Sequence, residues 1–280
     1  MNIENTLSLA IKTLYKFNIK NPILDSEILL SKAISKDRNY IILNSHKKIN
    51  KENLDDFNYL IERRKKGEPV AYITNKKEFW NDSFYVDKNV LIPRPDSELI
   101  IDQVLKIFKK NKQLQLLDIG VGSGCILLSL LKERPNFFGT GIDISKKSIR
   151  ISEYNAKILQ LTNRVKFFNS DVDNFKIGKY DLIVSNPPYI KLLDLKYLEK
   201  DIINFEPKLA LNGGFDGFSE IRKVIIKAAG LIKKNGKLIL EIGFSQREKA
   251  KKILKENGFY TNKVLKDYGK KDRCIISTKI

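Results

Sequence analysis

The stretch LQLLDIGVGSGCILLSLL, residues 114–131, decides the fold class of this chain. Its first seven residues form an apolar run typical of a strand buried on both faces of a parallel sheet, and its last seven form a helical run. Glycine between two such elements lets the backbone turn sharply and approach a ligand closely. A dinucleotide-binding fingerprint would need a further glycine where the chain has Cys125, which disfavours an NAD site. The glycine loop consists of Gly120, Val121, Gly122, Ser123 and Gly124.

Acidic side chains follow the next two predicted strands. Residues 137–142 form an apolar run that ends at Asp143, about 20 residues beyond the glycine loop, where a carboxylate can bind both hydroxyls of a ribose. Residues 164–169 form a third strand candidate, and Asp171 and Val172 follow it. We therefore expect a nucleoside site at these strand ends. Asp143 has an alternative interpretation as the N-cap of the helix that starts nearby.

The tetrapeptide Asn186-Pro187-Pro188-Tyr189 follows another predicted buried strand, residues 179–185. An amide or aromatic amine nitrogen is a poor nucleophile because its lone pair is delocalised, so a catalyst must fix its hydrogens. The Asn186 oxygen can accept one N–H. The Pro187 carbonyl can accept the other, because its backbone is fixed and Pro188 has no competing N–H. Tyr189 can then lie flat on the planar group, although a Pro-rich turn without catalytic role remains the alternative.

Alternating strand and helix patterns over residues 95–280 predict an α/β fold with a doubly wound, mostly parallel sheet. The last two strand candidates, residues 259–265 and 273–278, are joined by a link too short for a parallel crossover. The last strand should therefore run antiparallel.

Two segments precede this domain. Residues 1–75 carry apolar residues at helical spacing and predict a small helical domain. Residues 76–94 alternate in the manner of a β-hairpin, with Asn81-Asp82 as the turn, and form a predicted linker.

The formal charge of +19 has two interpretations, a nucleic-acid surface or a lysine-rich composition. Residues 1–75 carry +4 and residues 76–280 carry +15, so the charge is spread and no basic tail is present. Cys125, Cys274 and the single His46 have no metal-ligand or disulfide spacing, so we expect no metal and two buried, reduced thiols. No apolar run approaches the length of about 18 residues that a membrane span needs, and no signal-peptide pattern is present, so we expect a cytoplasmic protein.

Further segments make the likeness to known sequences more specific. Taken with the glycine loop and the Asn-Pro-Pro-Tyr tetrapeptide, the chain resembles class I S-adenosylmethionine-dependent methyltransferases. Within these it resembles bacterial release factor glutamine methyltransferases, the HemK/PrmC family, over nearly its whole length. The segments that carry this resemblance are GEPVAY at 67–72, EFW at 78–80, LIPRPDSE at 91–98, FEP at 205–207 and DYG at 267–269.

The resemblance implies methylation of the side-chain amide nitrogen, N(5), of the glutamine in the Gly-Gly-Gln tripeptide of class 1 peptide chain release factors. It implies S-adenosyl-L-methionine as cofactor, with the glycine loop around its methionine part and Asp143 on its ribose. Asp171 and Val172 would flank the adenine, although relatives often have an aromatic residue in place of Val172. Asn186 to Tyr189 would hold the glutamine, with Asn186 also beside the cofactor, and the helical segment would help to bind the release factor.

Three alternatives remain from the sequence. An N6-adenine DNA or RNA methyltransferase would use the same tetrapeptide, but it would need a recognition domain or base-flipping insert that this chain does not show. The sister family that methylates ribosomal protein L3 usually lacks the Ile-Pro-Arg-Pro-Asp pattern. A non-catalytic nucleotide-binding protein would leave the tetrapeptide unexplained. We therefore expect a monomeric enzyme with a protein substrate, no specific nucleic acid and no membrane partner.

Overall fold

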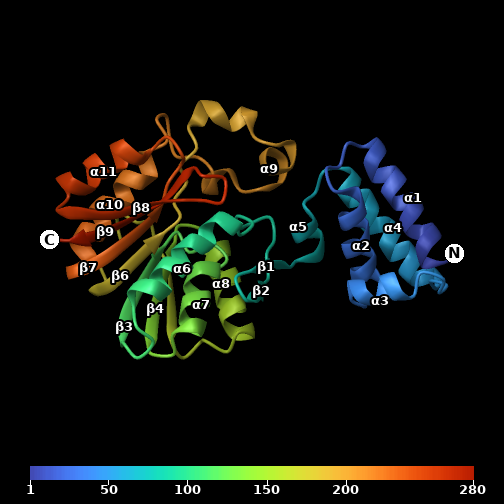
Figure 1. Ribbon diagram of the computed structural model, residues 1–280, viewed down its shortest axis with the longest axis horizontal. Helices are drawn as coiled ribbons and strands as arrows, with labels where there is room; N and C mark the ends of the chain where they lie inside the picture. Colours follow the sequence, from blue (N-terminus) through green and yellow to red (C-terminus); the bar gives the residue numbers. More distant parts are fainter. The chain divides into compact units, whose positions relative to one another are not determined.

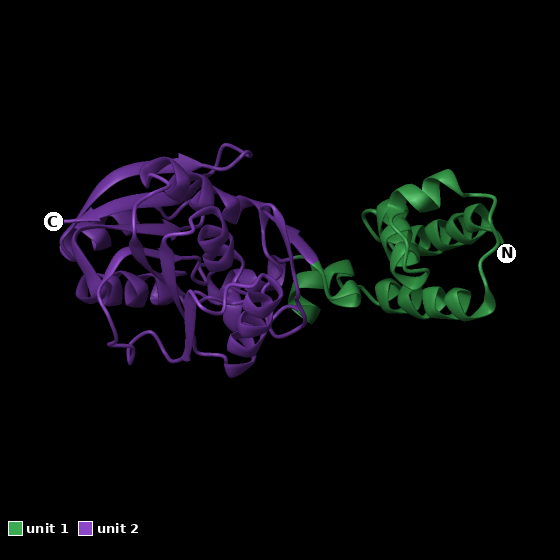
Figure 2. Ribbon diagram, turned by 90° about the horizontal axis from the view of Figure 1, so that it is seen from below, with its two compact units in different colours: residues 1–76, 199–205 green, residues 77–198, 206–280 purple.

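A computed structural model describes all residues of the chain, 1–280. The chain forms two compact units, coloured separately in Figure 2. Unit 1 contains Met1–Lys76 and the short segment Glu199–Phe205, and unit 2 contains Lys77–Leu198 and Glu206–Ile280. A segment from far along the chain therefore completes the N-terminal unit.

Unit 1 is helical, as the spacing of its apolar residues predicted. Asn2, Asp37 and Asn50 cap three of its helices by accepting backbone N–H groups, which satisfies donors that a helix start leaves unpaired. Its core contains Leu14, Leu29, Phe57 and other buried apolar side chains. The helices are α1 (Ile3–Lys16), α2 (Pro22–Ala33), α3 (Arg38–Leu43), α4 (Lys51–Lys65), α5 (Val70–Thr74) and α9 (Lys200–Phe205).

A buried arginine explains why α9 belongs to unit 1. Arg64 Nε donates to Asp25 Oδ2 at 2.7 Å, and Arg64 Nη1 donates to Asp201 Oδ2 at 3.2 Å. The Arg64 side chain is almost fully buried, so removal of either carboxylate would leave part of its charge unpaired in a poorly solvated place. This pair of bonds fixes the segment 199–205 to α4 and α2.

The hairpin of unit 2 is shorter than expected and turns one residue earlier. Strands β1 (Lys77–Phe79) and β2 (Asp82–Phe84) pair antiparallel, with Phe79 opposite Asp82, so the turn is Trp80-Asn81 and the predicted turn at Asn81-Asp82 is wrong. Trp80 adopts a left-handed φ of 54°, which a bulky residue rarely does. Two hydrogen bonds hold it there: its backbone N–H donates to Glu98, and its indole N–H donates to Glu133, both at 2.8 Å.

The remainder of unit 2 is built on a seven-stranded sheet, which confirms the predicted fold class. The strand order is β5-β4-β3-β6-β7-β9-β8; β3 to β7 run parallel, and β9 runs antiparallel to both of its neighbours. The strands are β3 (Leu114–Ile119), β4 (Phe137–Asp143), β5 (Val165–Asn169), β6 (Tyr180–Ser185), β7 (Ile232–Glu241), β8 (Phe259–Lys266) and β9 (Asp272–Lys279).

Helices cover both faces of this sheet (Figure 1). The neighbouring residues Leu116 and Leu117 on β3 point to opposite faces and belong to two separate apolar clusters. One face carries α6 (Glu98–Ile107), α7 (Cys125–Glu133) and α8 (Lys146–Ile158), and the other carries α10 (Ser219–Leu231) and α11 (Arg247–Glu256). Short 3₁₀ helices lie at η1 (Pro95–Ser97), η2 (Leu192–Tyr197) and η3 (Lys208–Ala210). No helix in the chain combines the length and the apolar character needed to cross a membrane.

The five parallel strands bring the predicted site residues to one edge of the sheet, because their carboxyl ends all lie there. The chain order reverses between β3 and β6, which is the position where open α/β sheets bind ligands. Polar or glycine residues lie at each of the five strand ends: Gly120 after β3, Asp143 in β4, Asp171 after β5, Asn186 after β6 and Glu241 in β7.

Candidate active site

The glycine loop after β3 depends on backbone conformations that favour glycine. Gly120, Gly122 and Gly124 have left-handed φ angles of 77°, 56° and 83°. A Cβ added to Gly120 would meet no heavy atom within 4 Å, so this part of the loop borders open space. The loop therefore presents bare backbone to a ligand at the switch point of the sheet.

Asp143 connects this loop to the start of α8. Its Oδ2 accepts the backbone N–H of Gly122 at 3.0 Å, and its Oδ1 accepts that of Ser145 at 2.8 Å. Burial raises the pKa of Asp143, and these two hydrogen bonds oppose the shift. The alternative role as helix N-cap is wrong, since Ser145 caps α8 by accepting the N–H of Ser148. Each carboxylate oxygen keeps a further acceptor site for a ligand hydroxyl.

Asp171 and Val172 follow β5 at the outer end of the row of strand ends. Asp171 Oδ1 accepts the N–H of Asp173 at 2.8 Å and closes a turn, while Val172 packs against the apolar cluster on the α10 side of the sheet. Asn169, which the sequence did not single out, joins the ends of β5 and β4 by donating to the carbonyl oxygens of Asp143 and Ile144 at 3.0 and 2.8 Å.

The nitrogen and the oxygen of the Asn186 side-chain amide have different surroundings. Its Nδ2 donates to Ser97 Oγ at 2.9 Å. Its Oδ1 accepts no hydrogen bond from the chain. The buried side-chain atoms that lack a partner are Ser31 Oγ, Asp118 Oδ1 and Ser129 Oγ. Asn186 Oδ1 is not among them, so it is accessible. The carbonyl of the buried Pro187 also accepts no hydrogen bond from the chain. Two unused acceptors therefore lie on consecutive residues.

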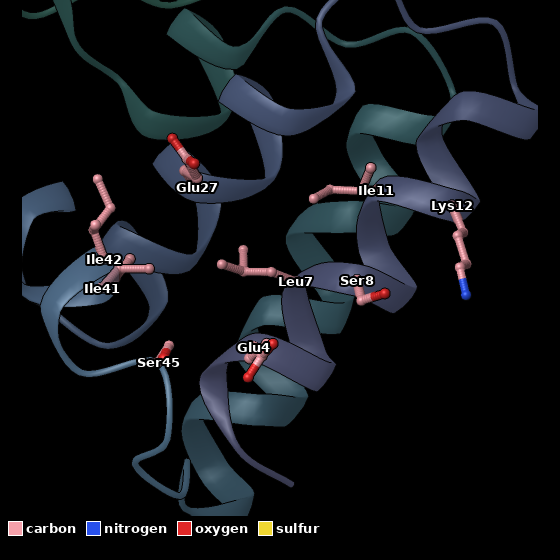
Figure 3. Close-up of a pocket in the computed structure, with 9 residues that line it drawn as sticks. All are labelled: Glu4, Leu7, Ser8, Ile11, Lys12, Glu27, Ile41, Ile42 and Ser45. Atoms are coloured by element: carbon pink, nitrogen blue, oxygen red, sulfur yellow. The ribbon is translucent and has the colours of Figure 1, made fainter.

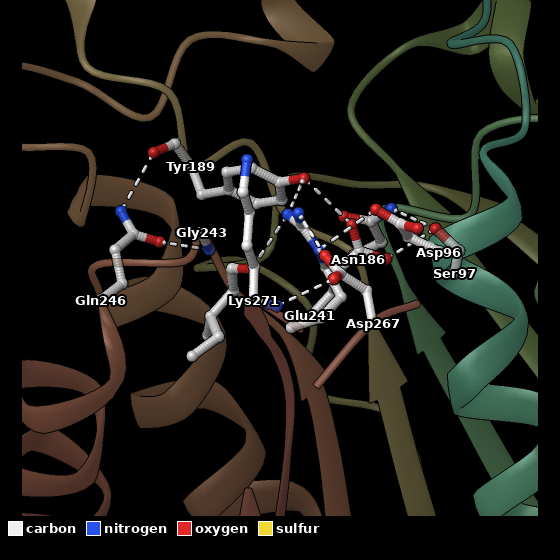
Figure 4. Close-up of polar contacts among 11 residues, drawn as sticks. Asp96, Ser97, Asn186, Tyr189, Glu241, Gly243, Gln246, Asp267 and Lys271 are labelled. Atoms are coloured by element: carbon white, nitrogen blue, oxygen red, sulfur yellow. Dashed lines mark hydrogen bonds and ion pairs between the residues drawn. The ribbon is translucent and has the colours of Figure 1, made fainter. Parts of the chain in front are cut away.

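A buried polar network lies behind the tetrapeptide (Figure 4). Glu241, at the end of β7, accepts from Ser97 Oγ at 2.6 Å and from the Tyr189 hydroxyl at 3.1 Å. Arg273 on β9 donates to the same Tyr189 hydroxyl at 3.2 Å and pairs with Asp267 at 2.9 Å. Burial and the charge of Glu241 raise the pKa of Tyr189 far above its ordinary value. The phenol is therefore neutral and its ring orientation is fixed.

Glycines and one glutamine hold the tetrapeptide from the other side. Gln246 Nε2 donates to the Tyr189 carbonyl at 3.0 Å, while Gln246 Oε1 accepts the Gly243 N–H at 2.8 Å. A Cβ on Gly213 would lie 2.8 Å from the Tyr189 backbone, and one on Gly217 would lie 2.7 Å from its carbonyl oxygen. Only residues without a side chain fit here, so the loop has little freedom.

Sequence reasoning missed Ser97, Glu241, Arg273 and Gln246. Glu241 ends the apolar run Leu238-Ile239-Leu240 in the same manner as Asp143 ends its strand, so the same signal could have found it. Ser97 lies in the motif LIPRPDSE, but its partner Glu241 is 144 residues away and nothing local reveals the contact.

The chain has neither a metal-binding cluster nor a reactive cysteine beside this site. No group of three or more His, Cys, Asp or Glu side chains is placed to hold a metal ion. Cys274 is buried, and Cys125 as a whole residue is half-buried but its thiol lies in the interior. Burial raises the pKa of both thiols, that of Cys125 to about 12, so neither is a reactive thiolate.

A groove of about 380 Å³ lies in unit 1 and contains none of the predicted site residues (Figure 3). Leu7 and Ile11 on α1 and Ile42 on α3 line it, with Glu4 and Glu27 at its margin.

Comparisons with known proteins identify the family of this chain. A family model described as PrmC N-terminal domain matches residues 5–74, and one described as methyltransferase small domain matches residues 97–215. The release factor glutamine methyltransferase of Buchnera aphidicola subsp. Baizongia pistaciae is 38% identical over 283 residues, which cover 100% of both chains. That of Clostridium acetobutylicum is 36% identical over 282 residues, covering 100% of this chain and 99% of its own. The chain belongs to the release factor glutamine methyltransferase family.

One further relative and one solved structure extend the comparison. A bifunctional methyltransferase of Rickettsia conorii is 35% identical over 304 residues, and this chain spans 58% of its length. A methyltransferase from Pyrococcus furiosus, 20% identical, superposes with a TM-score of 0.53 over 70% of this chain and 88% of its own. This likeness shows the class I methyltransferase fold of unit 2.

As a methyltransferase of this family, the enzyme uses S-adenosylmethionine, and the site residues fit that cofactor. The open space beside Gly120 accommodates a ligand against bare backbone, and Asp143 retains acceptor capacity for two vicinal hydroxyls. When bound, the cofactor supplies a methyl group on a positively charged sulfur.

Proposed function

We propose that this enzyme methylates N(5) of the glutamine in the Gly-Gly-Gln tripeptide of class 1 peptide chain release factors. The activity for which its relatives are named, release factor glutamine methylation, supports this substrate. The observation that carries the proposal is the orientation of Asn186, whose NH2 group is occupied by Ser97 and whose oxygen is open. With the Pro187 carbonyl it offers two acceptors, which match the two N–H bonds of one primary amide.

The chemistry requires orientation more than a strong base. Asn186 Oδ1 and the Pro187 carbonyl accept the two amide N–H groups, so the nitrogen lone pair points away from them and toward the methyl group. That lone pair forms the new N–C bond as the C–S bond breaks, and the nitrogen loses one proton through these acceptors to solvent. Glu241 is not the base, because Ser97 and Tyr189 occupy its two oxygens in the interior.

The remaining site residues are assigned to the cofactor. In this assignment the Gly120 to Gly124 loop holds the methionine part, Asp143 the ribose, and Asp171 with Val172 the adenine. Their positions at adjacent strand ends support the assignment. The anchored ring of Tyr189 lies against the planar glutamine amide, and Asn186 lies between substrate and cofactor.

The helical N-terminal domain, residues 1–75, contributes to release factor binding in this proposal. Its match to the PrmC N-terminal domain supports this, as do the exposed apolar side chains of Ile42 and Leu43, which are 59% and 77% accessible. The double change Ile42→Ser with Leu43→Ser should lower release factor affinity several-fold without changing cofactor affinity. Tyr260→Ser, which removes an exposed side chain from β8, is the matched control. Equal release factor affinities for the two variants would exclude this surface.

Because the proposed substrate belongs to the translation apparatus, we expect the enzyme to act in the cytoplasm, as a monomer without a nucleic-acid or membrane partner. The test offers labelled S-adenosylmethionine together with purified release factor, duplex DNA or ribosomal protein L3, in parallel. Mass spectrometry should locate the methyl group on the Gly-Gly-Gln glutamine. Label on adenine or on ribosomal protein L3, with none on release factor, would overturn the proposal.

A further inference from the structure

Ser97 lies between the side-chain amide of Asn186 and the carboxylate of Glu241. Its Oγ is 2.9 Å from Asn186 Nδ2 and 2.6 Å from Glu241 Oε2. Both Ser97 and Glu241 are only 2% exposed, so solvent has little access to the hydroxyl and the carboxylate. The three residues come from η1, the loop after β6 and the end of β7.

The chemistry of the three groups fixes the direction of each bond. An ionised carboxylate only accepts, so the single hydroxyl proton of Ser97 points to Glu241. Ser97 Oγ is then left as an acceptor, which requires Asn186 to present its NH2 group and not its oxygen. The Asn186 oxygen therefore points outward, where the glutamine amide of the substrate donates its N–H.

A second chain of bonds favours the ionised form of Glu241. Arg273 donates to the Tyr189 hydroxyl, so the phenolic proton must point to Glu241 Oε1. Both carboxylate oxygens thus face donors. Burial raises the pKa of Glu241, as does nearby Asp96, while Ser97, Tyr189 and the charge of Arg273 oppose that shift. The neutral thiol of Cys274, which pairs with Glu241 across the sheet, is also close to this carboxylate.

We infer that Ser97 and Glu241 are positioning residues that set the flip state of the Asn186 amide and so point its oxygen at the substrate glutamine. Neither residue touches the reacting atoms. The inference rests on the proposed function for its substrate, but the orientation of Asn186 can be tested without any substrate.

Glu241→Gln gives the most specific expectation. Tyr189 still has a proton to donate, so the new Gln oxygen faces Tyr189 and its NH2 group faces Ser97. The Ser97 hydroxyl then accepts from that NH2 and turns its own proton to Asn186, which favours the wrong flip of the amide. Single-turnover methyl transfer should fall about 10-fold or more, as for loss of a preorganised polar partner.

Ser97→Ala only removes the acceptor and leaves the amide free to adopt either flip, so its rate should fall less than that of Glu241→Gln. Ser97→Thr keeps the hydroxyl and should restore most of the rate. Cofactor affinity should change much less than the rate in all three variants, because the glycine loop and Asp143 are untouched. A role limited to folding would instead lower the melting temperature in step with the rate.

The deciding experiment combines two measurements on the full chain. In ¹⁵N spectra without substrate, hydrogen exchange of the Asn186 side-chain NH2 should be slow in the wild type and in Ser97→Thr, and fast in Ser97→Ala. In a double-mutant cycle, adding Ser97→Ala to Asn186→Ala should cause no further loss of rate, because Ser97 acts only through Asn186.

Fast exchange in the wild type, or multiplicative losses in the cycle, would overturn the inference. Failure of the wild type to methylate release factor would instead overturn the proposed function, and the exchange measurement would still decide the orientation of Asn186.

Discussion

The backbone N–H of Gly122 donates to Asp143 Oδ2 at 3.0 Å, which ties the glycine loop after β3 to the end of β4. The same carboxylate accepts from Ser145 at the start of α8. Asp143, the residue assigned to the ribose of the cofactor, therefore also fixes the loop assigned to its methionine part.

Asp143→Ala should weaken S-adenosylmethionine binding by about one to two orders of magnitude, because a pair of charge-assisted hydrogen bonds contributes roughly 1.5–3 kcal/mol. Asp143→Asn retains one accepting oxygen and should fall between the wild type and the alanine variant. Calorimetric titration measures both, and an unchanged affinity in Asp143→Ala would remove this residue from the ribose site.

Asp118 should make the stability of the enzyme depend on pH. Burial first, and then the nearby Asp143, raise the pKa of Asp118 to about 8 from 3.8. The folded state favours the protonated form of Asp118, and this preference stabilises the folded protein fully below about pH 4. The stabilisation decreases as the pH rises to about 8, and above that the stability no longer depends on this group. Asp118→Asn stays neutral throughout, so its melting temperature should rise relative to that of the wild type as the pH increases from 4 to 8. A difference between the two proteins that does not change from pH 4 to pH 8 would contradict the assignment.

Gly213→Ala should disturb the active-site loop through steric contact alone. Its new Cβ would lie 2.8 Å from the backbone of Tyr189, although its φ lies outside the left-handed region. We expect a large loss of methyl-transfer rate with a lowered melting temperature. Gly230→Ala in α10 is the matched control, since its Cβ would meet nothing within 4 Å and should leave the rate unchanged while stabilising the helix. Equal rates for the two variants would show that the loop adapts.

The charge of +19 should not give tight DNA binding. If the lysine excess is compositional, binding to duplex DNA near physiological salt should stay in the nonspecific range, about 10⁻⁴ to 10⁻⁶ M. Fluorescence anisotropy over a series of salt concentrations measures this. Sequence-selective binding at nanomolar protein would favour the adenine methyltransferase alternative instead.

The parts of this structure that depend on neighbouring residues could be predicted from local sequence patterns. The apolar runs at 114–119 and 180–185 became buried central strands, and the short link before β9 correctly predicted its antiparallel direction. The turn at Trp80 could not be found in this way, because contacts with Glu98 and Glu133 stabilise its strained backbone.

The features that could not be predicted depend on contacts between residues far apart in the sequence. Arg64 binds Asp201 over a separation of 137 residues, so α9 joins unit 1 without any local sign of it. Ser97 contacts Asn186 and Glu241 over separations of 89 and 144 residues, and nothing in the local sequence joins them.

The central claim is that Asn186 Oδ1 holds the substrate amide for methyl transfer, and the single-turnover rate of Asn186→Ala on release factor tests it most directly. The account predicts a fall of about 10²-fold or more, comparable to removal of one preorganised polar partner from an active site, with little change in melting temperature. Asn186→Asp keeps the size and the acceptor oxygens and should retain some activity with an altered pH dependence. A wild-type single-turnover rate in Asn186→Ala would contradict the account.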